Sequence, residues 1–303
     1  MTDTKTVRTS PPGTPAAAPR KGVRGPLPWI VMAALFVAAV VYIRTAVPGE
    51  GTPAPAPSAH GSHAAGFHGD GLSDAQDGYR LEPVTLPDTR GAAVPLAFRI
   101  LGPDGAPVTG YATVLDEPLH LYVVREDLSL YQHLHPTLAD GTWSTTVSVP
   151  DGGVYRMYAD FTPLNRNPTV LGVPFVIAGD TRYVPLALPA ASATAGGFTV
   201  RRVDGLARLP AKAPGTLRFQ VLDAAGAPVT ALERYLGVYA HVSAFDIYDQ
   251  ALTHLHPADS AAPPADGILT FHTGFRQRGE QRLFLQFKAG GTVHEVAFTV
   301  TVG

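Results

Sequence analysis

The chain has 303 residues, of which 31 are Gly and 29 are Pro, and it contains no Cys. A chain of this length has room for about two domains, and its many turn-forming residues indicate strands joined by turns rather than long helices. The absence of Cys excludes disulfides, iron–sulfur clusters and Cys-ligated zinc. A net charge of −2 without a basic patch argues against a nucleic-acid partner.

An apolar run without charged residues spans 27–43, and Arg44 follows it. As a helix this run would measure roughly 25 Å, near the short end of what crosses a bilayer. Basic residues precede it, which predicts a disordered cytoplasmic tail at 1–26 and places the rest of the chain outside the cytoplasm. We expect an uncleaved signal anchor in the cell membrane. A cleaved signal peptide is the alternative, which is disfavoured by the length of the run and by Arg44, which follows the run at once without a clean A-x-A site.

The segment 44–77 is rich in Pro and Gly and is typical of a spacer. It contains His60, His63 and His68. A histidine-rich tract of this kind can capture a divalent metal loosely, and the alternative is that these residues are ordinary polar spacer composition.

From residue 78 on, short runs of β-branched and aromatic residues are bounded by turn residues, and no amphipathic helical pattern occurs. This pattern is typical of a β-sandwich or a β-barrel.

The second half of the chain repeats the first. Residues 96–136 align without a gap onto 217–257, and the two segments share the sequence Gly-Ala-Pro-Val-Thr as well as His-Leu-His-Pro. A period this long indicates two tandem domains rather than a solenoid. We predict β-sandwich domains at 78–180 and 197–303, joined by a linker at 181–196.

Each copy carries three histidines on a predicted hairpin. In the first copy His120 lies between two leucines, and His133 and His135 are two residues apart in the following strand. Side chains alternate across a strand and cross-strand neighbours share a face, so all three imidazoles are expected on one face, with His120 opposite His135 or, in a shifted register, opposite His133. The same argument groups the histidines of the second copy: His241, His254 and His256.

Three neutral imidazoles within cross-strand reach can bind zinc or copper(II), whereas the lack of Cys and the scarcity of Met disfavour copper(I). In the structural alternative, each His-x-His-Pro segment ends a strand and hydrogen-bonds a neighbouring loop. An organic or protein ligand is the third interpretation. His272 and His294 have no counterpart in the first copy, and we expect them to be ordinary surface residues.

The sequence contains no G-x-S-x-G, H-E-x-x-H, Walker or G-x-G-x-x-G motif. Its adjacent carboxylates, Asp116-Glu117 and Glu126-Asp127, are explained by solvated turns. We therefore expect no enzymatic activity.

The stretch from Leu119 to Pro136, with its His-x-His-Pro motif, is followed by Asp140-Gly-Thr-Trp143 and by Gly153-Val-Tyr-Arg-Met-Tyr-Ala-Asp-Phe161. These segments resemble the YtkA-like and FixH-like immunoglobulin-like domains of secreted or membrane-anchored bacterial proteins. The resemblance implies an immunoglobulin-like fold and an association with metal through His120, His133 and His135. The missing Cys and Met depart from the pattern of metallochaperones and argue against copper trafficking.

Together these observations predict an all-β chain with two tandem immunoglobulin-like β-sandwich domains after a single N-terminal transmembrane helix. The expected function is that of a membrane-anchored extracytoplasmic binding protein whose histidines hold copper(II) or zinc. The alternative is a non-catalytic structural or adhesive envelope module that docks a partner protein, with the histidines structural. A sensory ectodomain is disfavoured because a cytoplasmic tail of residues 1–26 is too short for an output domain.

Overall fold

The computed structural model describes residues 69–258 and 262–303, apart from the side chain of His254. The predicted tail at 1–26, the apolar run at 27–43 and the spacer up to residue 68, with its three histidines, lie outside the described residues. The described residues belong to one compact unit, Ser62–Gly303. They form strands and turns without a helix, and accordingly none of them forms a helix that could span a membrane.

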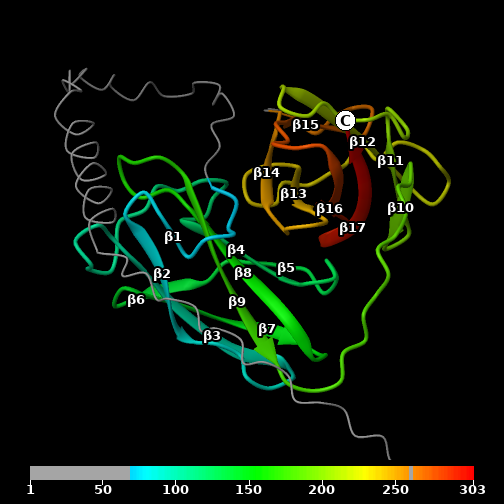
Figure 1. Cartoon of the computed structure of the whole chain (residues 1–303). Helices are drawn as coiled ribbons and strands as arrows, with labels where there is room; N and C mark the ends of the chain where they lie inside the picture. The colour runs from blue at the N-terminus through cyan, green and yellow to red at the C-terminus, as the bar shows by residue number, and fades with distance from the viewer. Residues whose placement is uncertain (1–68, 259–261) are drawn as a thin grey trace, which may run out of the picture. The chain divides into compact units, whose positions relative to one another are not determined.

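The first repeat is a sandwich of two antiparallel sheets, drawn from cyan to green in Figure 1. The four-stranded sheet has the order β5 (Gln132–Leu134), β4 (Leu119–Arg125), β8 (Gly153–Phe161), β9 (Thr169–Ile177). The five-stranded sheet has the order β1 (Ala75–Gln76), β2 (Tyr79–Thr85), β3 (Gly91–Leu101), β7 (Thr142–Val149), β6 (Thr137–Ala139). An apolar core that includes Phe98, Leu121 and Trp143 fills the space between the sheets.

The second repeat is one continuous antiparallel sheet of eight strands, drawn from yellow-green to red in Figure 1. Its order is β10 (Ser192–Ala195), β11 (Phe198–Arg202), β12 (Gly215–Leu222), β15 (Ile268–Thr273), β14 (Leu252–Pro257), β13 (Ala240–Asp246), β16 (Gly279–Ala289), β17 (Thr292–Val302). Strand β14 pairs with β13 through Leu252 to Leu255 and with β15 through His256 and Pro257. Because this strand passes from one layer to the other, the sheet encloses its own core.

The strands of the two repeats follow the sequence correspondence. β4 begins at Leu119 and β13 at Ala240, which are corresponding positions of the alignment, and β8 and β16 both begin at a glycine, Gly153 and Gly279. The described residues are therefore all-β and sandwich-like, as the spacing of the apolar runs predicts.

Two strands lie in segments that the sequence indicates as spacer or linker. β1 falls within the spacer at 44–77, and β10 falls within the linker at 181–196. β10 pairs with β11 across Gly196 and Gly197, whose φ angles are 57° and 84°. This two-residue turn is a favoured hairpin connection, and it pairs a segment of small residues that has little strand signal of its own.

The strands that carry His120 and His241 are buried on both faces. Every residue of β4 and of β13 is buried, although the alternation of side chains in β4 predicts a single apolar face. The second face is covered because apolar side chains of both repeats pack together there: Tyr122, Val124, Leu128, Tyr158 and Val170 from the first repeat, and Phe245, Leu252 and Phe284 from the second. The histidines thus lie in the interior of the compact unit rather than on an open sheet face.

Candidate metal centre

His120 is held by a strained turn that precedes its strand. The His120 side chain is 3% exposed, and its Nε2 lies 2.9 Å from the carbonyl oxygen of Val114. Val114 and Glu117 close a two-residue turn by reciprocal backbone hydrogen bonds. The central residues of that turn, Leu115 and Asp116, have φ angles of 49° and 62°. A leucine in this left-handed region is uncommon and costs energy, so the turn is maintained by its surroundings, and its carbonyl fixes the outer nitrogen of His120.

The second repeat contains the same turn and the same hydrogen bond to its strand histidine. His241 is 6% exposed, and its Nε2 lies 2.8 Å from the carbonyl oxygen of Tyr235. Tyr235 corresponds to Val114 in the alignment of the repeats, and the central residues of its turn, Leu236 and Gly237, also have positive φ. Each repeat therefore directs a turn carbonyl at Nε2 of its buried strand histidine.

The hairpin of β4 and β5 brings the three histidines of the first repeat together. Leu121 is paired with Leu134 and Tyr122 with His133, which is the register that places His120 diagonal to His133. Nδ1 of His120 lies 3.0 Å from Nε2 of His133. One ligand nitrogen from each of His120, His133 and His135 falls within 4.8 Å of the others. The predicted grouping of these three imidazoles is thus present in the structure.

Two residues that the sequence does not single out complete this arrangement. Nδ1 of His133 lies 2.9 Å from Oε1 of Gln286, and Nε2 of Gln286 donates to Oε2 of Glu295 at 2.9 Å. Gln286 is in β16, where it is paired with His241 on one side and with Glu295 on the other. The available signal was a polar residue in the otherwise apolar run Leu283-Phe-Leu-Gln-Phe287.

The hydrogen bonds at the outer nitrogens of His120 and His133 fix the tautomers of both rings. As a result, the two inner nitrogens need a cation between them. The carbonyl of Val114 can only accept, so Nε2 of His120 carries a hydrogen. A Glu295 carboxylate can also only accept, so Gln286 turns its NH₂ group to Glu295 and its carbonyl to His133, whose Nδ1 then carries a hydrogen. If both rings are neutral, the two inner nitrogens face each other with lone pairs at 3.0 Å. Such a contact requires a cation between the nitrogens, either a proton or a metal ion.

The other titration properties of the cluster favour neutral imidazoles. Burial, followed by the charge of His120, lowers the pKa of His133 well below its ordinary value of 6.5. Burial and His120 likewise lower the pKa of His135 to about 4. Nε2 of His135 is buried and has no hydrogen-bond partner among the residues that the structure describes. Neutral imidazole is the form that ligates zinc and copper(II).

The predicted grouping of the three histidines of the second repeat stays a prediction, because only two of their side chains lie within the described residues. The His241 ring centroid lies 5.7 Å from that of His133 and 6.5 Å from that of His120, so His241 adjoins the first cluster. The side chain of His254 lies outside the described residues, and His256 is paired with His272 between β14 and β15. His272 is exposed, as expected.

The expectation that His294 is an ordinary surface residue is wrong. Its ring packs 4.8 Å from that of Phe198 and 5.3 Å from that of Phe287. The reason is the hairpin of β10 and β11, which covers this part of β17 and which the sequence did not reveal.

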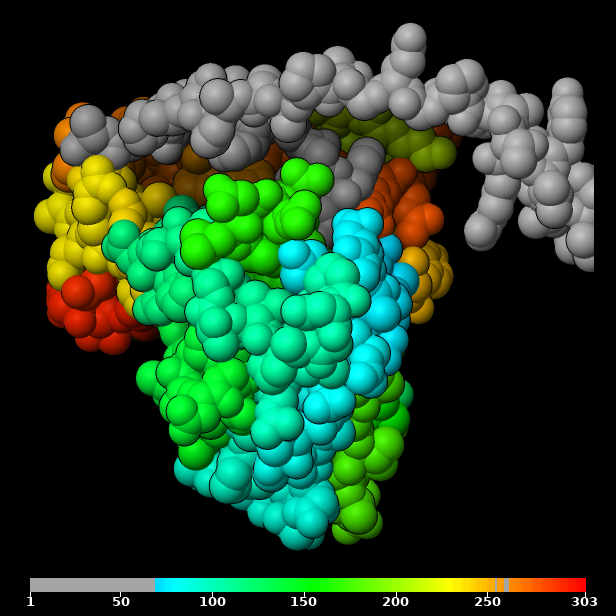
Figure 2. Space-filling model, turned by 90° about the vertical axis from the view of Figure 1, so that its left-hand side faces the viewer, coloured from blue at the N-terminus to red at the C-terminus, as the bar shows by residue number. Residues whose placement is uncertain are grey.

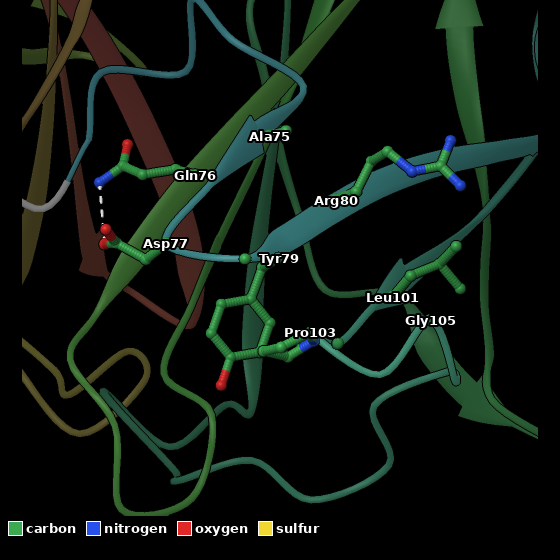
Figure 3. Close-up of a pocket in the computed structure, with 10 residues that line it drawn as sticks. Ala75, Gln76, Asp77, Tyr79, Arg80, Leu101, Pro103 and Gly105 are labelled. Carbon is green, nitrogen blue, oxygen red and sulfur yellow. Dashed lines mark hydrogen bonds between the residues drawn. The ribbon is translucent and has the colours of Figure 1, made fainter. Parts of the chain in front are cut away.

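A surface depression of about 510 Å³ lies away from the histidines and is lined by Gln76, Asp77, Arg80 and Pro103, among others. In Figure 3 the Gln76 amide faces the Asp77 carboxylate, while the Arg80 guanidinium extends away from them. The residues of β1 to β3, in cyan, form part of the open surface of the first repeat in Figure 2. The lining of this depression includes no histidine and offers no cluster of metal ligands.

Comparison with known proteins identifies a family and a set of distant structural neighbours. The family described as "Domain of unknown function (DUF8832)" matches residues 74–179 and 193–303. None of the curated proteins matches the sequence. The expected relation to YtkA-like and FixH-like domains stays a prediction.

Solved structures with similarity include a DUF4426 family protein from Pseudomonas aeruginosa PAO1, at 14% identity and a TM-score of 0.27, over 37% of this chain and 94% of that one. FdeC, an adhesin of Escherichia coli, has 12% identity and a TM-score of 0.24 over 75% of this chain and 65% of that chain. Yersinia pseudotuberculosis InvD has 15% identity and a TM-score of 0.23 over 75% of this chain and 58% of its own. At TM-scores this low, these similarities carry no argument about function.

Proposed function

The chain belongs to the DUF8832 family and carries the family's domain twice, and on this premise we propose that it is a non-enzymatic extracytoplasmic binding protein that holds one divalent metal ion, zinc or copper(II), on His120, His133 and His135. The apolar run at 27–43 would anchor it in the cell membrane, with the described residues outside the cytoplasm.

One observation carries the proposal: the inner nitrogens of His120 and His133 lie 3.0 Å apart while both outer nitrogens face hydrogen-bond acceptors. Histidines that ligate metals donate their other ring N–H to a carbonyl or a carboxylate, which fixes the tautomer and the orientation of the ring. The Val114 carbonyl and the Gln286 amide oxygen occupy these outer positions. Two nitrogens bound tetrahedrally to one ion at about 2.0–2.1 Å are separated by about 3.3 Å, so the observed 3.0 Å spacing would have to open only slightly to admit the ion.

His135 supplies the third ligand. Its buried Nε2 has no hydrogen bond within the described part of the chain, and a buried polar atom without a partner costs free energy. A metal ion offers that nitrogen a partner. In a purely structural role, nothing would offset the free-energy cost of the unpaired nitrogen.

A titration of the full-length protein tests the proposal. The purified protein, treated with a chelator and then dialysed, is titrated with zinc and with copper(II) by calorimetry. We expect saturable binding by the unchanged protein and, because a ligand is lost, a weakening of at least about 100-fold in His135→Ala, beyond the effect of losing an outer partner. His272→Ala, which removes an exposed histidine, serves as the matched control and should bind as the unchanged protein does.

His135→Ala is the informative variant because the structure gives its Nε2 no hydrogen bond to lose. Its melting temperature without metal should stay close to that of the unchanged protein. Absence of metal binding by the unchanged protein would overturn the proposal, and so would unchanged affinity in His135→Ala.

The second candidate is a structural or adhesive envelope module, and one observation favours it. His120 and His241 make the same hydrogen bond to a turn carbonyl in both repeats, which is what a shared structural role requires. In that case a proton shared between His120 and His133 would take the place of the metal. Failure to bind metal, together with a lowered melting temperature in His120→Ala, would support this candidate.

A further inference from the structure

We infer that the second repeat completes the metal site, so that a single ion is bound where the two repeats meet, with His241 as its fourth nitrogen ligand and Gln286 as the positioning residue for His133. This inference rests on the proposed function. It differs from the expectation of one three-histidine site in each repeat.

The position of His241 is suited to a fourth ligand. Four imidazoles around one ion have ring centroids about 5 Å apart, given metal–nitrogen distances of about 2.0–2.1 Å. The three rings of the triad are separated by 4.7 to 5.2 Å. The His241 ring lies 5.7 Å from His133 and 6.5 Å from His120, so a displacement on the order of 1 Å would bring it to ligand distance.

The tautomer of His241 also fits. Its Nε2 faces the Tyr235 carbonyl at 2.8 Å and therefore carries the hydrogen. The neutral ring then has its lone pair on Nδ1, which is the atom that His120, held by the equivalent carbonyl in the first repeat, directs at His133. Each repeat thus holds its strand histidine, His120 or His241, in the same tautomer, with the lone pair on Nδ1.

One strand pair of the second repeat carries both groups that serve the site. His241 and Gln286 are directly opposite each other in β13 and β16, and cross-strand partners of this kind project from the same face of a sheet. Gln286 holds His133 through its Oε1, and Glu295 prevents the amide from turning over by accepting from its Nε2. The face that orients a ligand of the first repeat is therefore the face that presents His241.

A fourth nitrogen has a physical reason in this environment. His120 and His241 are almost entirely buried, whereas His133 and His135 are half-buried, so water has little access to an open coordination position on the side of His241. Zinc bound in closed protein sites takes four ligands in a tetrahedral arrangement. An ion bound by three histidines alone would keep an unfilled position in a buried surrounding, where the loss of hydration is costly.

The test measures how many nitrogens coordinate the metal and how many metal ions bind to the full-length protein. Copper(II) is added to the unchanged protein and to His241→Gln, and the nitrogen hyperfine pattern is recorded by electron paramagnetic resonance. Zinc affinity is measured in parallel by competition with a chelator. His241→Gln keeps an N–H that can reach Tyr235, so the turn is preserved while the ring nitrogen is removed.

We expect one ion per chain, four coupled nitrogens in the unchanged protein and three in His241→Gln, with zinc affinity reduced by at least about tenfold. Gln286→Leu should also reduce the affinity by about 10- to 100-fold, because His133 loses its outer partner, and Gln286→Glu should restore it. His272→Ala should change none of these quantities.

The outcomes separate the two proposals. Metal binding with unchanged affinity and unchanged nitrogen count in His241→Gln would overturn the fourth ligand while leaving the triad in place. Two ions per chain would also overturn it. Absence of binding by the unchanged protein would remove the proposed function itself.

Discussion

At the scale of single residues, Gln286 decides what the histidine pair can hold. If His133 had no acceptor at its outer nitrogen, its hydrogen could move to Nε2 and donate to His120, and two neutral rings would satisfy each other. Gln286 prevents this because its carbonyl faces Nδ1 of His133 while its amide donates to Glu295. A side chain in the second repeat thereby leaves the pair in the first repeat in need of a cation.

The pH dependence of the free energy of unfolding should reveal the lowered pKa values of the buried histidines. The pKa of His135 is lowered to about 4 by burial and by His120, and that of His133 is lowered as well. In the unfolded chain these residues titrate near their ordinary pKa of about 6.5, so below this value the unfolded state binds more protons than the folded state. The part of the free energy of unfolding that depends on His135 should therefore fall in the metal-free protein as the pH is lowered from about 6.5 toward 4, and this part should be constant above that range.

Urea unfolding at several pH values in the presence of a chelator measures this slope. His135→Gln should show a shallower decrease than the unchanged protein, because one group that resists protonation has been removed. His272→Ala retains that group and should follow the unchanged protein. Equal slopes for His135→Gln and the unchanged protein would contradict the assignment of a lowered pKa to His135.

At the scale of elements, the sequence was sufficient to predict the hairpin that carries the triad. The alternation of His120 with leucines and the spacing of His133 and His135 predict a common face, and the register of β4 and β5 places them there. This succeeded because side chains alternate with a period of two and because cross-strand neighbours share a side. The repeat also predicts the equivalent strand, β13, at the right position.

The partners of the triad could not be predicted in the same way. Gln286 and Glu295 belong to strands far along the chain, and their role depends on how one sheet face packs against another, which periodicity within a strand does not encode. The burial of Tyr122 and Val124 has the same origin, because they pack against Phe245 and Phe284 rather than facing solvent. The sequence pattern thus predicts which side chains share a sheet face, whereas the contacts between two faces are seen only in the structure.

The end of strand β4 is fixed by a buried cation that has no counterpart in the second repeat. Arg125 is 1% exposed; it donates to both carboxylate oxygens of Asp127 and also to Asp151. Burial alone would raise the pKa of Asp127, but the hydrogen bonds from Arg125 and Ser129 lower it to about 2. The corresponding residue in β13 is Asp246, which instead accepts from Gln281.

Replacing Arg125 with Met should destabilise the protein by about 3 kcal/mol, the low end for breaking a buried ion pair, because both carboxylates keep some contact with water. Chemical denaturation followed by circular dichroism measures the change. Arg80→Met is the matched control, since Arg80 pairs with Glu82 at the surface, and it should cost no more than about 1 kcal/mol. Similar losses in both variants would show that the buried network is not a special source of stability.

At the scale of the whole described unit, the two repeats are joined through the faces that carry the histidines. Tyr131 of the first repeat stacks on Phe284 of the second with ring centroids 4.1 Å apart and planes inclined by 6°. The Tyr131 hydroxyl donates to Oγ of Ser243 at 3.1 Å. These contacts lie on the same pair of sheet faces as the bond between His133 and Gln286, so the metal site and the apolar contact should depend on each other.

A double-mutant cycle measures whether the two repeats stabilise each other through this contact. Phe284→Ala should destabilise the protein by about 3 kcal/mol, as is typical of the loss of a buried aromatic ring, and Tyr131→Ala by about 2 kcal/mol, because the Tyr131 ring is only partly buried. Because the rings are in contact, the double variant should lose less than the sum of the two, with a coupling of about 1 kcal/mol. Tyr155 stacks on Phe175 at 5.6 Å within the first repeat, so Tyr155→Ala combined with Phe284→Ala should be additive and serves as the control. Additivity of Tyr131→Ala with Phe284→Ala would show that the repeats do not pack through this face, and a site that combines His133 with Gln286 and His241 would then lose its physical basis.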